Sequence, residues 1–160
     1  MKKTLILFII LLSLLTFSKS IGLTLEFSSN NFENSERFYF DNFTRVDFLF
    51  MFANVPIALD NYIEKDIEKI VFTPYKEFNL NEIHLGLNVL KEKINNLELR
   101  FAVETPIKYF SNFEKYIFTI GTGFYINKDF LIQIGIKESL QDLNKKGFQP
   151  NFMLGFNLTF

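Results

Sequence analysis

Apolar residues recur at every second position along this chain, which is the spacing of a β-strand with one apolar face. The last segment shows the pattern most clearly. Phe152, Leu154, Phe156, Leu158 and Phe160 share one face, and the residues between them are small or polar, apart from Met153. Nine residues match the length of a tilted membrane strand, about 9–11 residues. The sequence therefore predicts a strand over residues 152–160.

The same alternation occurs in six earlier segments: residues 21–28, 45–52, 83–89, 97–104, 116–126 and 130–137. In the segment 45–52 the apolar face would carry Val46, Phe48, Phe50 and Phe52. Three connections between segments are short, near residues 54–56, 91–95 and 127–129, and three are longer and polar, at residues 29–42, 105–114 and 139–148. Short turns at one end and long loops at the other are typical of outer-membrane barrels.

An even number of strands requires one more strand between Pro56 and Asn81. We place it at residues 57–63, with residues 64–81 as an outer loop. Two alternatives stay open, because Ile63, Ile67 and Ile70 have helical spacing and residues 69–75 would also suit a strand. The predicted fold is an all-β, antiparallel up-and-down transmembrane β-barrel of eight strands. Ten strands would result if residues 35–40 formed a separate strand.

Two segments echo each other, FANVPI at residues 52–57 and FAVETPI at residues 101–107. The first is assigned here to an inner turn and the second to an outer loop. If the echo is a true repeat, one of these assignments is wrong.

The first twenty residues have a different character. Lys2 and Lys3 precede an apolar run at residues 4–17, and Ser18 and Ser20 stand at the −3 and −1 positions of a cleavage site. This run of fourteen residues is shorter than the about 20 that a membrane-spanning helix needs. We predict a secretory signal peptide cleaved after Ser20 and a barrel domain over residues 21–160. An uncleaved helical anchor is the alternative.

Composition narrows the function classes. Without Lys2, Lys3 and Lys19, 14 basic residues remain against 18 acidic ones, so we expect no nucleic-acid partner. The chain has no cysteine, which excludes disulfides and thiolate metal sites. We expect no metal and no cofactor. The 22 phenylalanines are more than a narrow lumen could hold, which favours their exposure to lipid.

The face opposite the apolar stripe is polar. Its members are Glu26, Arg45, Asp47, His84, Asn88, Glu98, Arg100, Glu104, Thr119, Gln133, Lys137 and Asn157. Eight strands enclose an interior about wide enough for side chains to fill, and buried charges need partners. We therefore predict an ion-paired network of Glu26, Arg45, Asp47, His84, Glu98, Arg100, Glu104 and Lys137 in place of an open pore. Glycines on the same face, at positions 22, 86, 121, 123, 135 and 155, would relieve crowding.

Two groups on this face have a catalytic interpretation. His84, the only histidine, could be the general base of a lipid hydrolase, or an interior histidine held by hydrogen bonds. Glu98 and Glu104 could form a paired-carboxylate site, or balance the charges of Arg45 and Lys137. We favour the structural interpretation of both and predict no catalytic residue. Lys145 and Lys146, on a predicted outer loop, could touch lipid headgroups.

The C-terminal run Gly155-Phe156-Asn157-Leu158-Thr159-Phe160 resembles the insertion signal of outer-membrane barrels. Gly155, Leu158 and Phe160 match that signal, whereas Met153 stands where it usually has a polar residue. Over residues 21–160 the chain resembles the OmpA/OmpX-like eight-stranded barrels in architecture alone. The resemblance implies an outer-membrane location, contact with outer-membrane lipids and recognition by the barrel-assembly machinery. It implies no particular activity.

Three functions follow as hypotheses. The first is a non-enzymatic outer-membrane barrel that serves envelope structure or surface interaction through its outer loops. The second is a lipid-modifying enzyme, an acyltransferase or deacylase, which would need His84 beside a serine or carboxylate. The third is a soluble periplasmic lipocalin-like binder, which requires the apolar faces to point inward. The orientation of the two faces separates the third hypothesis from the others.

Overall fold

The computed structural model describes residues 20–28, 36–48, 50–65, 68–74 and 79–160. The predicted signal peptide, except for Ser20, lies outside the described residues. Ser20 itself is the first residue of strand β1 (Ser20–Phe27).

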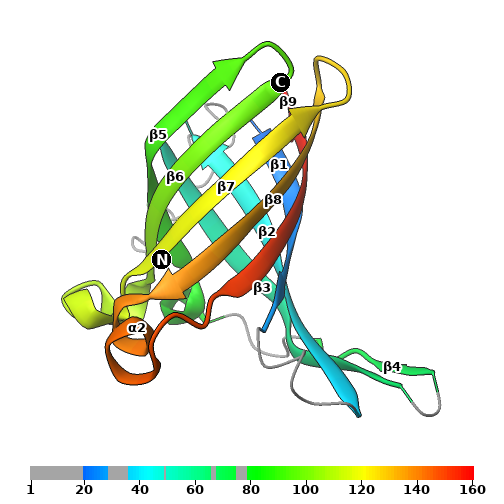
Figure 1. Cartoon of the computed structure of the whole chain (residues 1–160), viewed down its shortest axis with the longest axis vertical. Helices are drawn as coiled ribbons and strands as arrows, with labels where there is room; N and C mark the ends of the chain where they lie inside the picture. Colours follow the sequence, from blue (N-terminus) through cyan, green and yellow to red (C-terminus); the bar gives the residue numbers. More distant parts are fainter. Residues whose placement is uncertain (1–19, 29–35, 49, 66–67, 75–78) are drawn as a thin grey trace, which may run out of the picture.

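The described part of the chain is mostly β-structure (Figure 1). After β1 its strands are β2 (Arg37–Phe48), β3 (Met51–Glu64), β4 (Lys69–Val71), β5 (His84–Ile94), β6 (Leu97–Pro106), β7 (Ile117–Tyr125), β8 (Phe130–Ser139) and β9 (Asn151–Thr159). Its helices are α2 (Leu140–Lys146) and the 3-10 turns η2 (Leu80–Glu82), η3 (Ile107–Tyr109) and η4 (Phe113–Lys115).

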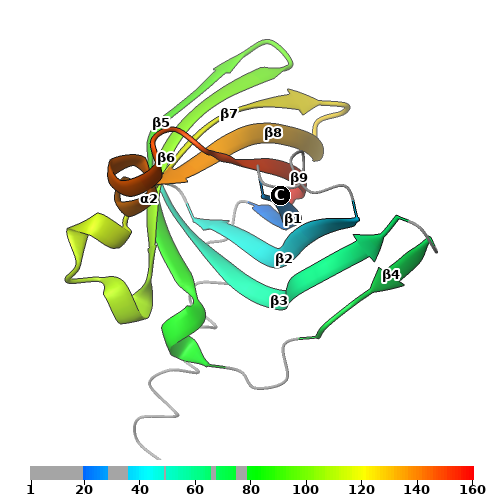
Figure 2. The same cartoon turned by 60° about the horizontal axis from the view of Figure 1, so that its bottom comes forward.

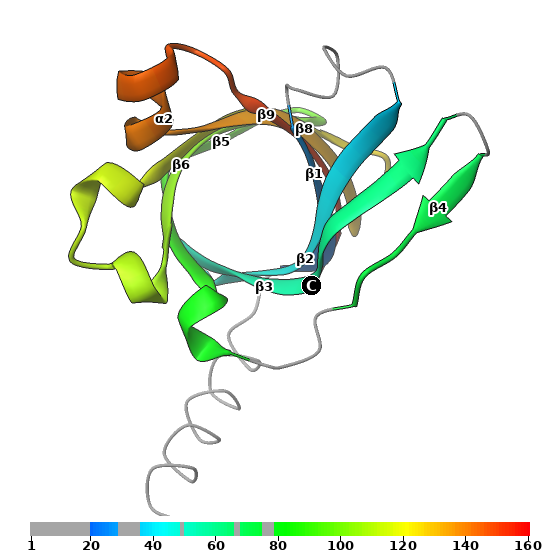
Figure 3. The same ribbon diagram turned by 90° about the horizontal axis from the view of Figure 1, so that it is seen from below.

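Eight of these strands close into a ring. Each barrel strand pairs antiparallel with the next one along the chain, in the order β1, β2, β3, β5, β6, β7, β8, β9. The ring closes where β1 meets β9, with Ser20 opposite Thr159 and Phe27 opposite Phe152. β4 lies outside the ring and pairs with the end of β3 (Figure 3). The predicted eight-stranded up-and-down barrel is confirmed.

The two ends of the barrel differ (Figures 1 and 2). At one end, called here the turn end, lie the tight β5–β6 and β7–β8 connections and the last residues of β9. At the other, the loop end, lie α2, η2, η3, η4 and the β3–β4 hairpin. The short connection predicted at residues 127–129 is found there, where Asn127 Oδ1 accepts hydrogen bonds from the backbone of Asp129 and Phe130. The helix α2 within the predicted loop 139–148 was not foreseen.

The chain reverses earlier than predicted in the second hairpin. Phe48 pairs with Met51, so the turn lies between them and not at residues 54–56, which are inside β3. The predicted single strand 45–52 is therefore wrong, because it joins the end of β2 to the start of β3. The reversal also turns Phe52 into the lumen, where it is buried, whereas the sequence pattern placed it on the apolar face.

This correction explains the sequence echo. FANVPI lies in β3 and FAVETP in β6, and both strands run from the turn end toward the loop end. The assignment of residues 52–57 to an inner turn was the wrong one of the pair.

The segment between Pro56 and Asn81 contains more strand than predicted. Residues 57–63 are strand, as predicted, but they continue the same strand β3 that begins at Met51. Lys69–Val71 forms β4, so the alternative strand at 69–75 exists in part, outside the ring. Of the helical alternative, Ile63 and Ile70 lie in β3 and β4, whereas residue 67 lies outside the described residues. Residues 37–40, in place of a separate strand, begin β2 and shorten the predicted loop 29–42.

Side chains alternate between the two faces of the wall in the arrangement of a membrane barrel. Ile134 in the middle of β8 is 56% exposed on the outside, whereas Arg45 is 1% exposed inside. The charged residues predicted to face inward do so, and the aliphatic and aromatic stripe covers the outside. A barrel that binds apolar ligands within its lumen would have these faces reversed.

The pairing between β3 and β5 is the shortest in the ring. It runs only from Met51 opposite Leu87 to Asn54 opposite His84. Beyond Asn54, Pro56 has no N–H to donate to a neighbouring strand, and β3 bends away with β2 toward β4 (Figure 2).

Candidate functional site

The site built by the barrel is its polar lumen. Seven of the eight residues predicted for the network come from strands β1, β2, β6 and β8, and His84 is the first residue of β5. Their side chains all project inward, Glu26 and His84 toward the loop end with a small exposed fraction and the other six deeply buried. They form two groups of ion pairs.

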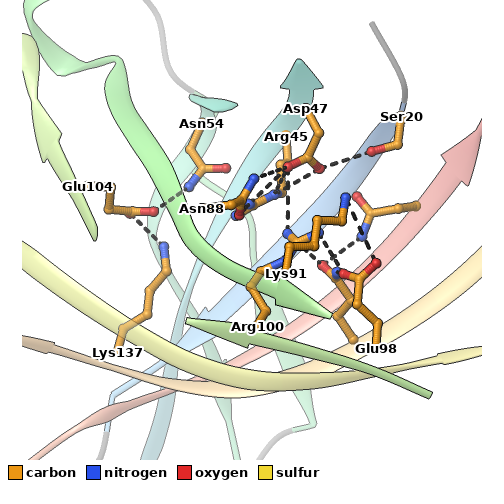
Figure 4. A network of polar contacts seen from close by, with 12 residues as sticks. Ser20, Arg45, Asp47, Asn54, Asn88, Lys91, Glu98, Arg100, Glu104 and Lys137 are labelled. Atoms are coloured by element: carbon orange, nitrogen blue, oxygen red, sulfur yellow. Dashed lines mark hydrogen bonds and ion pairs between the residues drawn. The ribbon is translucent and has the colours of Figure 1, made fainter. Parts of the chain in front are cut away.

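The first group, called here the turn-side cluster, consists of Arg45, Asp47, Lys91, Glu98 and Arg100 (Figure 4). Arg45 Nη2 lies 3.1 Å from Asp47 Oδ1, and Arg100 Nη1 lies 3.6 Å from the same oxygen. Arg100 Nη2 is 2.8 Å from Glu98 Oε1, and Lys91 Nζ is 3.8 Å from Glu98 Oε2. Arg100 thus links the two carboxylates.

Neutral polar groups add hydrogen bonds to the two carboxylates of this cluster. Ser20 Oγ donates to Asp47 Oδ2 at 2.9 Å, and Tyr125 donates its hydroxyl to Glu98 Oε2 at 2.9 Å. Gln133 Nε2 donates to Glu98 Oε1 at 3.1 Å, and Gln133 Oε1 accepts from Asn157 Nδ2 at 2.9 Å. Each carboxylate is therefore bound by at least one neutral donor besides its cation.

The second group, called here the loop-side cluster, consists of Glu26, His84, Glu104 and Lys137. Lys137 Nζ lies 2.7 Å from Glu104 Oε1 and also pairs with Glu26. His84 Nδ1 lies 2.9 Å from the same Glu104 oxygen, and Asn54 Nδ2 donates to Glu104 Oε2 at 2.9 Å. Figure 4 shows Glu104 between Asn54 and Lys137.

The two clusters balance each other in charge. The turn-side cluster has three bases and two acids, and the loop-side cluster has one base and two acids when His84 is neutral. Burying an isolated charge costs many kcal/mol, whereas a paired and hydrogen-bonded one is tolerated. The ion-paired side chains of the two clusters thus comprise four acids and four bases, whose formal charges cancel when His84 is neutral.

Apolar side chains also occupy the lumen. Phe52 is buried beneath the guanidinium of Arg45, whose Cζ lies 3.7 Å from the ring centroid. Leu131 and Met153 are buried on the same inner face. The plug is thus a packed interior in which cations also contact aromatic rings.

Several members of the network escaped the sequence analysis, among them Lys91 and Asn54. Lys91 had been assigned to a turn, but a bulge in β5 between Asn88 and Leu90 places both Val89 and Leu90 outside and turns Lys91 inward. Asn54 had been assigned to a turn because Pro56 lies close to it in the sequence. Period-2 reasoning has no signal for a bulge, so only the strand pairing reveals Lys91.

The candidate catalytic groups are separated by the fold. Glu98 belongs to the turn-side cluster and Glu104 to the loop-side cluster, and each carboxylate is engaged by its own cations. His84 forms a hydrogen bond with Glu104, and its ring lies tilted against the ring of Phe43, with 5.4 Å between the centroids. No group of His, Asp and Glu among the described residues is arranged to hold a metal ion.

The residues of the C-terminal motif lie on different faces of β9. Gly155 faces the lumen near Gln133, whereas Leu158 is exposed on the outer wall and Phe160 follows the end of the strand. Met153, the departure from the motif, is buried inside. Their role in membrane insertion stays a prediction.

The mouth of the lumen at the loop end is hollowed. A cavity of about 280 Å³ is lined by Glu26 and Lys137 of the loop-side cluster and by residues of β8 and α2, among them Glu138, Ser139, Asp142 and Lys146. The N-terminus of α2 is capped there, because Ser139 Oγ accepts from Asp142 N at 3.0 Å and donates to Asp142 Oδ2 at 2.6 Å. The Ser139 hydroxyl, and next Lys146, lower the pKa of Asp142 below its usual 3.8.

No family model and no curated protein sequence matches the chain. One solved structure, described as "De novo design of transmembrane beta-barrels", is similar with a TM-score of 0.47 and 10% identity, over 90% of this chain and 96% of that one. Among the described residues no helix has the length and apolar character to cross a bilayer.

Proposed function

We propose that this chain is an integral outer-membrane β-barrel with a closed lumen, which serves envelope structure or surface interaction through the segments at its loop end. One observation supports the proposal above all others. The ionised side chains are paired inside the ring, and the large apolar side chains cover its outer wall.

This distribution suits a bilayer and not water. Residues such as Ile120, Phe124 and Ile134 are each more than half exposed on the outside of β7 and β8. Such a continuous apolar surface would drive a water-soluble protein to aggregate. In hydrocarbon it is favourable, provided that the backbone is fully paired, and a closed ring of strands provides this pairing.

The soluble lipocalin-like alternative requires apolar side chains to line the lumen, and the lumen of this barrel is lined by charged ones. A small apolar ligand inside the ring would meet Arg45, Glu98 and Arg100 and would have to break their ion pairs. The enzymatic alternative gains a carboxylate beside His84, but the same carboxylate also binds Lys137. We therefore favour the non-enzymatic barrel.

The outer membrane as its location, an OmpA/OmpX-like relationship and recognition by the barrel-assembly machinery belong to this proposal. They are supported by the signal-peptide pattern of residues 1–20 and by Gly155, Leu158 and Phe160 at the C-terminus. The partners would be outer-membrane lipids and an unidentified ligand that binds at the cell surface, to the segments at the loop end.

The proposal is tested with the full chain expressed in a bacterium with two membranes. We expect it in the outer-membrane fraction, extractable only with detergent, and faster on gels when unboiled, as compact barrels are. In planar bilayers the purified barrel should show no steady conductance, because the plug fills the lumen. Recovery in the aqueous periplasmic fraction would refute the membrane location, and a steady open conductance would refute the closed lumen.

A further inference from the structure

Large apolar side chains are exposed on two segments that flank the outer wall at the loop end. One segment is the β6–β7 loop, residues 107–116, which contains η3 and η4, and the other is residues 140–148, which begin with α2. Together they are called here the overhang, and Figure 3 shows both outside the ring of strands. Phe110 is 64% exposed, Phe113 70% and Phe148 65%. Such exposed rings call for a covering that the described residues do not provide.

Many backbone groups of the overhang are hydrogen-bonded within it. Phe110 N donates to Ile107 O at 3.2 Å, and Tyr116 N donates to Phe113 O at 3.1 Å. The Tyr116 hydroxyl donates to Phe110 O at 3.0 Å. Leu140 N donates to Tyr116 O at 3.0 Å, which ties α2 to the β6–β7 loop. Backbone groups that enter lipid need partners within the protein, so this pairing allows the overhang to leave water.

The overhang and the barrel wall share one apolar surface. A hollow of about 170 Å³ lies between them, lined by Phe118 and Ile136 of the wall and by Leu143 and Phe148 of the overhang, among others. Its accessible surface is apolar. The proposed function places lipid against this side of the wall, so acyl chains in contact with Phe118 and Ile136 meet the overhang as well.

Two lysines of the β6–β7 loop are gathered around Tyr109. Lys108 Nζ lies 4.9 Å and Lys115 Nζ 5.3 Å from the centroid of the Tyr109 ring, and Lys108 also pairs with Glu82 at 2.6 Å. Tyrosine and lysine are side chains with an apolar body and a polar end, which suits the boundary between acyl chains and headgroups. The loop thus joins exposed phenylalanines to an aromatic–lysine group, a combination typical of segments that lie in a membrane interface.

We propose that the overhang lies at the boundary between headgroups and acyl chains, in the lipid leaflet at the loop end, with Phe110, Phe113 and Phe148 among the chains. Its partner is thus the lipid surface itself, and the polar face of α2, with Lys145, is turned toward water. No particular headgroup is required, since apolar side chains make the contact. The inference rests on the proposed membrane location and extends it, because it assigns to lipid two segments that would otherwise count as surface loops.

The absence of tryptophan from the chain allows a direct test, because a single introduced tryptophan reports on its own surroundings. Phe113→Trp is the reporter in η4, and Phe110→Trp is a second reporter in the same loop. Lys145→Trp is the matched control, since position 145 lies about 200° around α2 from Leu143. Phe124→Trp, on the outer wall of β7, reports contact with the bilayer.

Each variant of the full chain is reconstituted in vesicles of phosphatidylcholine brominated on its acyl chain, either near the headgroup or near the methyl end, and acrylamide is the quencher in water. We expect Phe113→Trp to be quenched more by the bromine near the headgroup. The depth obtained from the two bromine positions should be about 5–10 Å into the boundary between headgroups and acyl chains. Lys145→Trp should emit at longer wavelength and be quenched by acrylamide in preference to bromine.

The alternatives give different results. If acrylamide quenches Phe113→Trp and Phe110→Trp as strongly as Lys145→Trp, and bromine does not, the overhang faces water and the inference is overturned, even where bromine quenches Phe124→Trp. Protection of both reporters from both quenchers would mean that another protein surface covers the phenylalanines, which also overturns it. Equal bromine quenching at positions 113 and 145 would overturn the assigned orientation of α2. Absence of bromine quenching at every position, including Phe124→Trp, would instead refute the membrane location itself.

Discussion

The ring of Phe52 occupies the space beside Gly86, so that a Cβ atom at position 86 would lie 2.2 Å from Cζ of Phe52. Phe52 is buried in the lumen and directly opposite Gly86 in the β3–β5 pairing. The glycine therefore makes room for the aromatic ring at the shortest seam of the barrel.

Gly86→Ala should lower the free energy of unfolding by about 1–3 kcal/mol, because the ring must move within a packed interior. The measurement is urea unfolding of the barrel in lipid vesicles. Adding Phe52→Leu should remove most of the clash, so the two changes together should cost less than their sum. Gly155→Ala is the control, since the nearest atom to its new Cβ is 3.4 Å away. Strict additivity of the two changes would contradict the contact.

Lys137→Met should destabilise the barrel by about 3–5 kcal/mol, because the buried Glu104 carboxylate loses its lysine inside the lumen. Adding Glu104→Gln removes that uncompensated charge, and the double variant should be more stable than Lys137→Met alone. Glu26 loses its lysine in both variants, so the comparison isolates Glu104. Urea midpoints of the two variants decide this. A double variant that is less stable than Lys137→Met would contradict the ion pair between Glu104 and Lys137.

Ile134→Arg tests the membrane environment of the outer wall. Ile134 is 56% exposed, and an exposed position of a soluble protein would tolerate the change within about 0.5 kcal/mol. Near the bilayer midplane the same change should cost about 2–4 kcal/mol, and less near the membrane surface. Ile126→Arg, at a residue 57% exposed beside the β7–β8 turn, is the matched control. Equally small losses at both positions would argue against lipid contact.

The cap of α2 should be sensitive to acid. Because Ser139 and Lys146 lower the pKa of Asp142 below 3.8, ionised Asp142 stabilises the helix. This stabilisation is complete above the unfolded pKa of Asp142, near its usual value, and is lost as the pH falls through the lower folded pKa. A carbon-13 NMR titration of the Asp142 carboxyl should give a pKa below 3.8, and Ser139→Ala should raise it. A pKa that Ser139→Ala leaves unchanged would contradict the assigned cause.

His84→Gln should leave the lipid composition of the host membrane unchanged. The imidazole is held by Glu104 within the loop-side cluster, and we assign it a structural role. The measurement is mass spectrometry of acylated lipids from cells that produce either form at equal level. If the folded variant changed the acylation profile, the lipid-modifying alternative would replace the proposed function.

The strands of the C-terminal half of the barrel could be predicted from the sequence, because the turns between them contain residue types that favour turns. Asn127 and Asp129 mark one reversal, and Asn95 with φ of 55° marks another. The β2–β3 reversal has no such mark, since Phe48 and Met51 flank it and the apolar pattern continues across it. Pro56 resembles a turn residue but lies in β3 at the place where that strand leaves β5.

The sequence predicted which side chains face the lumen, but it did not predict which of them form ion pairs. Alternation alone places Arg45, Glu98 and Lys137 on one face. That Arg100 also reaches Asp47 while Glu104 binds Lys137 depends on how far each strand slides past its neighbours. The bulge that turns Lys91 inward, and the resulting equality of four acids and four bases, also arises from this register.

The amino-acid sequence was sufficient to show that the chain forms strands with one apolar and one charged face, because a two-residue period is a local property of the backbone. Tertiary structure alone decided which strand lies beside which, where the second hairpin reverses and how α2 folds over the outer wall. These features depend on contacts between residues far apart in the chain, and the free energy of such contacts is set only when the ring closes.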